Sequence, residues 1–172
     1  GRMDAALIFE ALSTACPAVA AYISIHNMVS WVLDKFANDD QKERWLTPLT
    51  TFDKLSSYCL TEPGAGSDAA ALATSARLDG DHYVLNGVKQ FISGAGSSDS
   101  YLVMARTGDA GAKGISAFMI DKDTPGLSFG ANEKKMGWRA QPTRQVMLDN
   151  VRVPVEDRIG DEGTGFKIAM AG

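Results

Sequence analysis

Apolar residues recur at helical spacing through the first 36 residues of the chain. Between residues 3 and 16 they fall three or four positions apart, as on one face of an amphipathic helix. Pro17 is well placed as the first residue of a second helix, where a proline loses no hydrogen bond. The apolar surface of this second helix is broad enough to need partners on several sides. The positions that define both helices are Leu7, Ile8, Ala11, Leu12, Ala15, Val19, Ile23, Val29, Leu33 and Phe36.

A third, short helix is predicted to begin after Asn38. Asn38 is a favourable N-cap, and Gln41 stands at the capping-box position three residues later. Asp39 and Asp40 favour the positive end of the helix dipole. Pro48 lies where we expect the helix to have ended.

From about Leu55 the pattern changes to short β-rich runs separated by turn dipeptides. Asp79-Gly80 and Asn86-Gly87 are the strongest hairpin signals in the chain. Short strands at this spacing favour an antiparallel sandwich or barrel over a doubly wound sheet. After residue 154 the pattern is helical again, with a helix starting near Phe166. The candidate strands are residues 55 to 61, 72 to 79, 82 to 86, 88 to 93, 100 to 106, 114 to 121 and 144 to 153.

Composition places the chain among globular proteins and disfavours several kinds of partner. Hydrophobic residues make up 45% of the 172 positions and charged residues 22%. The net charge of -4 and the scattered basic residues disfavour nucleic-acid binding. Cys16 and Cys59 match neither a disulfide framework nor a metal-ligand spacing, so we expect no metal site.

We also expect no membrane span and no signal peptide. The stretch between Glu10 and Asp34 carries no formal charge, but its polar residues, His26 among them, are too many for a helix in lipid. Near the N-terminus, Met3-Asp4-Ala5 leads straight into helical pattern. We therefore expect the chain to begin inside a larger protein.

The segment 58–68 joins a strand-like half to a glycine-rich elbow. Gly64 and Gly66 lack Cβ atoms and permit positive φ, which lets a flat ligand approach the backbone. Thr61 and Ser67 supply hydrogen-bonding groups without bulk. The same pattern is also typical of a plain surface turn with an Asx-type cap at its last residue. Taken alone, the elbow indicates either a cofactor site or such a turn.

Three further segments follow the elbow in an order that resembles the acyl-CoA dehydrogenase family. They are Asn86-Gly87-x-Lys89-x-Phe91-Ile92-Ser93, then Gly137-Trp138-Arg139, and finally Asp149-Asn150-Val151-x-Val153-Pro154 followed by Gly160-x-Glu162-Gly163-x-Gly165-Phe166. The resemblance covers essentially the whole chain. Within the family, the segments 91–96 and 137–144 look most like members that act on short branched-chain acyl-CoA thioesters.

The resemblance implies an α+β fold in three parts. Residues 1–53 correspond to the C-terminal part of an N-terminal helical domain, and residues 54–157 to an antiparallel β-sandwich or barrel domain. Residues 158–172 correspond to the start of a truncated C-terminal helical domain. The family's catalytic glutamate lies in that last domain, beyond Gly172, so no carboxylate of this chain is assigned the role.

The resemblance also implies a reaction and its partners. These are the FAD-dependent α,β-dehydrogenation of an isobutyryl-type acyl-CoA in valine catabolism, and an electron-transferring flavoprotein as electron acceptor. The implied assembly is a homotetramer, in the mitochondrial matrix of a eukaryote or the cytoplasm of a bacterium. On its own, the chain is expected to be inactive and to expose apolar faces on its first two helices. An acyl-CoA oxidase and a non-catalytic β-sandwich interaction module remain as alternatives.

By the same resemblance, two segments form a wall against FAD. Thr61 donates to the flavin, Phe91 packs on its ring, and Ser93 donates toward N5 or O4. Strand alternation puts Ile92 on the opposite side. Many family members have Trp and Thr at positions 91 and 93, and Phe and Ser keep the aromatic face and the hydroxyl. The cofactor-binding candidates are Tyr58, Cys59, Leu60, Thr61, Glu62, Pro63, Gly64, Ala65, Gly66, Ser67, Phe91, Ile92 and Ser93.

Several of these candidates have a second interpretation. Ser67 is also the substrate-binding candidate, at the thioester end of the acyl-CoA, but it can instead cap the following turn. Glu62 can form an ion pair or a turn contact, and Phe91 can belong to an ordinary sheet core. His26 and His82 have no partners at ligand spacing, and we interpret both as structural.

Overall fold

The structure is a computed structural model that describes residues 2–171. It opens with two helices, α1 (Arg2–Ala15) and α2 (Pro17–Phe36). A continuous helical stretch follows, made of α3 (Asp39–Gln41), the π-helical turn η1 (Lys42–Leu46) and α4 (Thr47–Thr50). The first two helices were predicted from apolar spacing, and Pro17 is the first residue of α2 as expected.

The predicted start of the third helix is confirmed, but its predicted end is wrong. Asn38 Oδ1 accepts from the Gln41 N–H at 2.9 Å, and Gln41 Oε1 accepts from the Asn38 N–H at 3.0 Å. The chain then passes through η1, where the Thr47 N–H donates to Lys42 O, and continues into α4. Because this change of bonding pattern starts a new first turn, the missing N–H of Pro48 costs nothing there.

In residues 2–171, eight strands form one sheet in the order β6-β7-β3-β2-β4-β5-β8, with β1 paired to β4. Pairing is antiparallel, except that β4 is parallel to β1 and to the start of β2. The strands are β1 (Ser56–Cys59), β2 (Ser75–Asp79), β3 (His82–Ser93), β4 (Ser100–Arg106), β5 (Ile115–Asp121), β6 (Leu127–Phe129), β7 (Thr143–Pro154) and β8 (Arg158–Ile159). Short 3-10 turns are η2 (Ala69–Ala71), η3 (Ala112–Gly114) and η4 (Val155–Asp157), and α5 (Gly165–Ala171) ends the fold.

The sheet curls over itself and encloses a core. The Tyr83 and Phe118 rings lie 4.9 Å apart, and the Tyr101 and Phe129 rings 5.2 Å apart, although neither pair comes from neighbouring strands. Such contacts between distant strands require a curved sheet, which agrees with the predicted sandwich or barrel. The α+β fold class is confirmed. The buried core residues are Cys59, Ala76, Tyr83, Leu85, Ile92, Ala95, Tyr101, Val103, Ala105, Phe118, Ile120, Val146, Leu148, Val151 and Val153.

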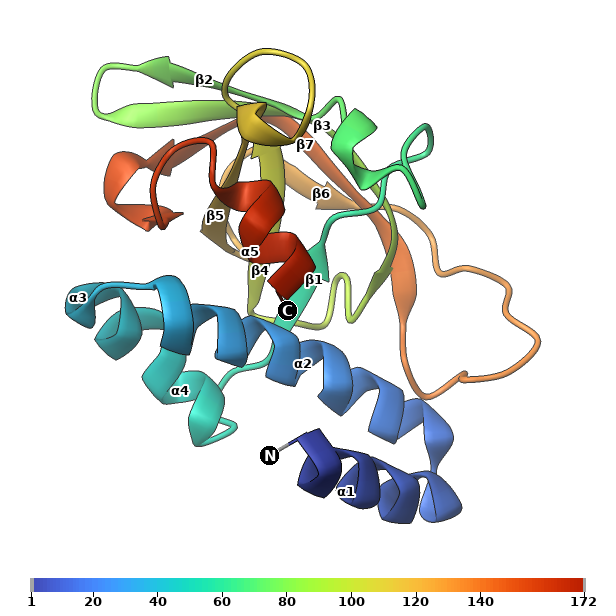
Figure 1. The fold of residues 1–172 in the computed structure, drawn as a ribbon. Helices are drawn as coiled ribbons and strands as arrows, with labels where there is room; N and C mark the ends of the chain where they lie inside the picture. The colour runs from blue at the N-terminus through green and yellow to red at the C-terminus, as the bar shows by residue number, and fades with distance from the viewer. Residues whose placement is uncertain (1, 172) are drawn as a thin grey trace.

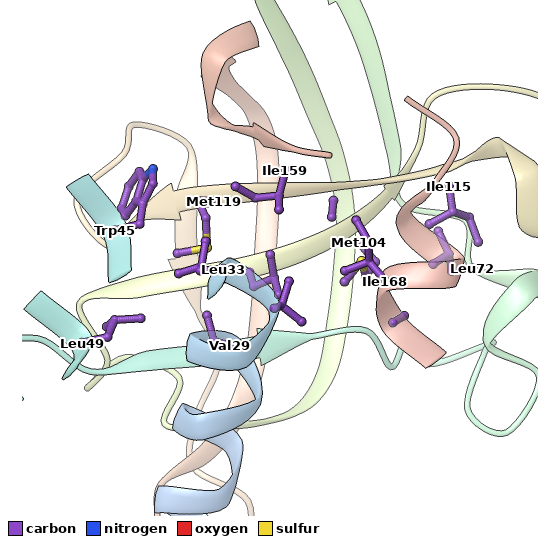
Figure 2. Close-up of a cluster of buried hydrophobic side chains, with 14 of the residues drawn as sticks. Val29, Leu33, Trp45, Leu49, Leu72, Met104, Ile115, Met119, Ile159 and Ile168 are labelled. Atoms are coloured by element: carbon purple, nitrogen blue, oxygen red, sulfur yellow. The ribbon is translucent and has the colours of Figure 1, made fainter. Parts of the chain in front are cut away.

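A second core lies between the helices and the outer face of β4 and β5. Side chains alternate along these two strands, so that Met104 and Met119 face the helices while Val103 and Phe118 face the curled sheet. Val29 and Leu33 of α2 and Ile168 of α5 pack onto this outer face (Figure 2). The helices therefore gather on one side of the β-domain, with α5 against β5 (Figure 1).

One of the two predicted hairpins is confirmed and the other is wrong. Asp79 pairs with His82 across a tight turn in which Gly80 has φ +65°. At Asn86-Gly87, however, β3 continues through a register shift in its pairing with β7. Asn86 instead serves as a partner for Asn150, accepting from its N–H at 2.9 Å and donating to its Oδ1 at 3.3 Å. The dipeptide is a β-bulge and not a turn.

Apolar side chains of the first two helices are exposed, as expected. Most of α1 lies at the surface, and so does part of α2. In the part of the chain that the structure describes, no helix has the length and apolar character needed to cross a membrane. The exposed large apolar residues of these helices are Met3, Leu7, Ile8, Leu12, Val19 and Trp31.

Candidate functional site

The elbow and the 91–93 segment lie side by side. The Gln90 N–H donates to Thr61 O at 2.8 Å, so the end of β3 is hydrogen-bonded directly to the start of the elbow. Earlier in the chain, on β1, Ser57 Oγ donates to Ser93 O at 2.6 Å. Two segments separated by more than twenty residues of chain are thus held together at both ends of their contact.

The elbow itself is a tight turn whose backbone at Gly64 and Gly66 is not covered by side chains. The N–H groups of Glu62 and Ala65 donate to each other's carbonyls at 3.0 and 3.1 Å. Gly64 and Gly66 do not adopt positive φ, so that part of the expectation is wrong. A Cβ atom built on either glycine would meet nothing within 4 Å. The space beside both backbones is open, as the approach of a flat ligand requires.

The two hydroxyls of the elbow have no partner within residues 2–171. Thr61 is half-buried and Ser67 is exposed, and neither side chain makes a hydrogen bond to another described residue. Asp68 precedes η2 but does not cap it through its side chain. The plain-turn interpretation predicted caps from Ser67 or Asp68, and these caps are not formed. Both hydroxyls are available to a ligand.

Phe91 is held outside the core by an irregularity in β3. The pairing with β7 shifts register between Lys89 and Ile92, and Phe91 adopts φ +57°, which is uncommon for a bulky residue. Its side chain is 61% exposed, whereas Ile92 is 2% exposed and Ser93 is half-buried. The sheet-core interpretation of Phe91 is therefore wrong. Strained backbone that displays an aromatic ring is typical of ligand sites.

Other candidates point their side chains inward. Cys59 and Ile92 belong to the core of the curled sheet, and Ala65 to the core beneath the helices. Burial raises the pKa of the Cys59 thiol to about 12, so this thiol is not a nucleophile at neutral pH. These three residues can meet a ligand only through their backbone. Tyr58 and Leu60 are partly buried against the helix-side core.

Glu62 forms a buried ion pair with Lys89, as its second interpretation predicted. Lys89 Nζ lies 2.7 Å from Glu62 Oε1 and 3.2 Å from Leu60 O. The carboxylate also accepts from the N–H groups of Ala73 at 2.7 Å and Thr74 at 3.0 Å. Burial pushes the pKa of Glu62 upward, but the Lys89 charge and these hydrogen bonds outweigh burial and hold it below its usual value. One buried pair therefore fixes the elbow to β3 and to the loop before β2.

The histidines have structural roles. His26 is buried, with Nε2 3.1 Å from Leu49 O and Nδ1 3.3 Å from the Ser56 N–H. His82 Nδ1 lies 2.5 Å from Asp81 Oδ1. Within residues 2–171, no group of three or more His, Cys, Asp or Glu side chains is arranged to hold a metal ion.

Comparison with known protein families places the chain in one of them. Residues 57–151 match the acyl-CoA dehydrogenase middle domain, and residues 1–53 match the acyl-CoA dehydrogenase N-terminal domain. The chain belongs to the acyl-CoA dehydrogenase family.

Particular relatives narrow this assignment. The chain is 57% identical over 171 residues to isobutyryl-CoA dehydrogenase, mitochondrial, of Bos taurus, and 54% identical over 170 residues to the Dictyostelium discoideum protein of the same name. These alignments cover 99% and 98% of the chain but 41% of each relative. The solved structure described as the FAD complex of PigA matches with a TM-score of 0.94 and 32% identity, covering 99% of this chain and 46% of that one.

Proposed function

We propose that this chain is part of an FAD-dependent acyl-CoA dehydrogenase that acts on short branched-chain thioesters of the isobutyryl type. The observation that carries the proposal is the pairing of the elbow with the 91–93 segment, where free hydroxyls, bare backbone and an exposed ring share one site. The 57% identity to the bovine isobutyryl-CoA dehydrogenase supports the choice of substrate.

The proposal extends to the setting of the reaction. We assign the chain to valine catabolism, within a homotetramer whose electrons pass to an electron-transferring flavoprotein. The location is the mitochondrial matrix in a eukaryote or the cytoplasm in a bacterium. The domain division at residues 53 and 157 is supported by the helices that make up most of residues 2–50 and by the strands that lie between residues 56 and 154.

The residues present fit a flavin. Bound FAD supplies a hydride acceptor for the β-carbon of the substrate. Thr61 presents a hydroxyl that has no hydrogen-bond partner among residues 2–171, suited to stabilise negative charge on a reduced ring. Phe91 offers an exposed aromatic face and Ser93 a hydroxyl, while Ser67 is placed on the exposed part of the elbow for the thioester. We assign the catalytic base to a glutamate outside residues 1–172.

Flavin content and electron acceptor test this proposal. A polypeptide of family length that contains residues 1–172 is expected to purify yellow with one FAD per chain. It should oxidise isobutyryl-CoA with an electron-transferring flavoprotein and not with oxygen. Rapid turnover with oxygen would identify an oxidase instead. A colourless protein that takes up no FAD would favour the interaction module.

Replacing Thr61 by alanine in that polypeptide is expected to lower the flavin reduction potential and to loosen FAD. A hydrogen bond to a charged group is worth about 1.5 to 3 kcal/mol, which corresponds to about 30 to 60 mV for a two-electron couple. Spectroelectrochemical titration measures the potential directly. Thr51→Ala is the matched control, because Thr51 is exposed on the turn that follows α4. An unchanged potential in Thr61→Ala would refute the role.

A further inference from the structure

We propose that Gln141 is a positioning residue that turns the Ser93 hydroxyl proton toward the flavin. The inference rests on the function proposed above. Gln141 Nε2 donates a hydrogen bond to Ser93 Oγ, and Ser93 Oγ has no other hydrogen-bond partner within residues 2–171. Gln141 lies in the segment before β7, outside the elbow and outside the 91–93 segment.

The backbone of Gln141 is fixed by its surroundings. The residue is 4% exposed. Next to it, the Gly94 N–H donates to Pro142 O at 2.8 Å. Lys135 Nζ directs its donors to the Gln141 carbonyl at 2.5 Å, the Trp138 carbonyl at 2.8 Å and Thr143 Oγ1 at 2.9 Å. The lysine thereby holds the segment 138–143 together, and the Gly94–Pro142 bond joins it to the end of β3.

Ser93 is equally well fixed, except for its hydroxyl. Its backbone pairs with Thr143 of β7, and its carbonyl accepts from Ser57 Oγ at 2.6 Å. The neighbouring Ile92 side chain is anchored in the core. The Ser93 hydroxyl can therefore still rotate about its C–O bond. The direction of its proton depends on the side chain that it is hydrogen-bonded to, which is Gln141.

The chemistry of an amide decides that direction. A hydroxyl donates one hydrogen bond and accepts two, whereas an amide NH₂ group only donates. With Gln141 Nε2 bound to its oxygen, Ser93 keeps its proton for a different acceptor. Within residues 2–171 the Ser93 hydroxyl donates to no described acceptor, so the proton is available to an acceptor on a bound ligand, as flavin N5 and O4 are. In the opposite amide orientation, Gln141 Oε1 would accept this proton, and the Ser93 hydroxyl could not donate to a ligand.

A double-mutant cycle on FAD binding tests the inference. The polypeptide of family length is stripped of FAD and titrated with it, and flavin fluorescence reports the dissociation constant. A net hydrogen bond is worth about 0.5 to 1.5 kcal/mol, so Gln141→Met and Ser93→Ala should each raise the dissociation constant about three- to tenfold. If Gln141 acts through Ser93, the double variant should bind FAD no more weakly than Ser93→Ala alone.

Spectroscopy separates this role from a general loosening of the fold. Gln141→Met and Ser93→Ala should shift the absorption spectrum of bound oxidised flavin in the same way. Gln145→Met is the matched control, because Gln145 donates to Gln90 Oε1 at 2.6 Å and not to Ser93. It should leave the flavin spectrum unchanged. If Gln141→Met does not fold, Gln141→Asn retracts the amide by one carbon and should give the same shift.

Failure of the Gln141 role and failure of the proposed function would give different results. Multiplicative effects of the two substitutions, or wild-type affinity in both Gln141 variants while Ser93→Ala binds weakly, would overturn the positioning role and leave the flavin site intact. Failure of the unsubstituted polypeptide to take up FAD would instead overturn the proposed function.

Discussion

Replacement of Lys89 by methionine is expected to destabilise the 172-residue chain by about 3 to 5 kcal/mol, the usual cost of removing one partner from a buried ion pair. Lys89 is fully buried, and its ammonium contacts both Glu62 and the Leu60 carbonyl. Methionine fills a similar volume but leaves the Glu62 carboxylate charged and buried without a cation. Urea unfolding, followed by circular dichroism, measures the loss.

Two companion variants show whether the buried charge is the cause. Lys54→Met removes a lysine that is 46% exposed and 3.9 Å from Asp121, so its effect should stay below about 1 kcal/mol. Adding Glu62→Gln to Lys89→Met removes the stranded charge and keeps an oxygen for the Thr74 N–H. This pair should recover at least about 1 kcal/mol. A loss in Lys89→Met no larger than that in Lys54→Met would contradict this account of the elbow.

Lys89→Met should also weaken FAD binding. Because the ion pair fixes Leu60 and Glu62 on either side of Thr61, its loss frees the segment that we assign to the cofactor wall. In the polypeptide of family length, Lys89→Met is therefore expected to purify with little FAD. Full FAD content in this variant would show that the wall does not depend on the pair.

Replacement of Gly165 by alanine is expected to destabilise the chain by about 1 to 3 kcal/mol, the range for overpacking a tight contact. A Cβ atom at Gly165 would lie 2.6 Å from the Ser116 carbonyl carbon and 2.8 Å from Ile115 O. Both atoms belong to the backbone of β5, which has little room to yield. Thermal unfolding by calorimetry measures the change.

Gly66→Ala provides the matched control for that glycine. Its Cβ atom would meet nothing within 4 Å and its φ is not positive, so the change should stay within about 0.5 kcal/mol. Equal stability of the two variants would contradict the close packing of α5 on β5. That packing also reaches the candidate site, because the Tyr58 hydroxyl donates to Ala169 O at 3.4 Å and so joins α5 to β1, the strand that leads into the elbow.

Features that depend only on residues close together in the sequence were predicted correctly. The Asn38 capping box and the Pro17 helix start depend on residues within four positions of each other, and both are confirmed. Asn86-Gly87 has the local signal of a hairpin, but β3 lies between β2 and β7 and continues straight through. Pairing on both sides outweighs the turn preference of two residues.

Short elements left no periodic signal. β6 has three residues and β8 has two, fewer than any alternation pattern needs. β6 exists because Leu127 and Phe129 pair with β7 and pack against the curled sheet. These partners come from elsewhere in the chain and were not visible in the segment itself.

The site was predicted in part because a family resemblance marked the elbow and the 91–93 segment. The bonds that hold the two together were not predicted, since Thr61 meets Gln90 and Ser57 meets Ser93 only in the folded chain. Lys89 lies within the 86–93 motif, and a lysine among apolar strand residues was a signal that a buried partner exists. Gln141 lies within the 137–144 segment that carried part of the resemblance, but a glutamine beside a proline gave no sign of a buried partner.

The central claim is that the elbow and the 91–93 segment form one wall against a flavin. A crystal structure of the polypeptide of family length with FAD tests it most directly. We predict that the isoalloxazine ring contacts Thr61 and Ser93 at once, with Phe91 against its face. A ring that contacts only one of the two segments, or lies elsewhere on the β-domain, would contradict the claim.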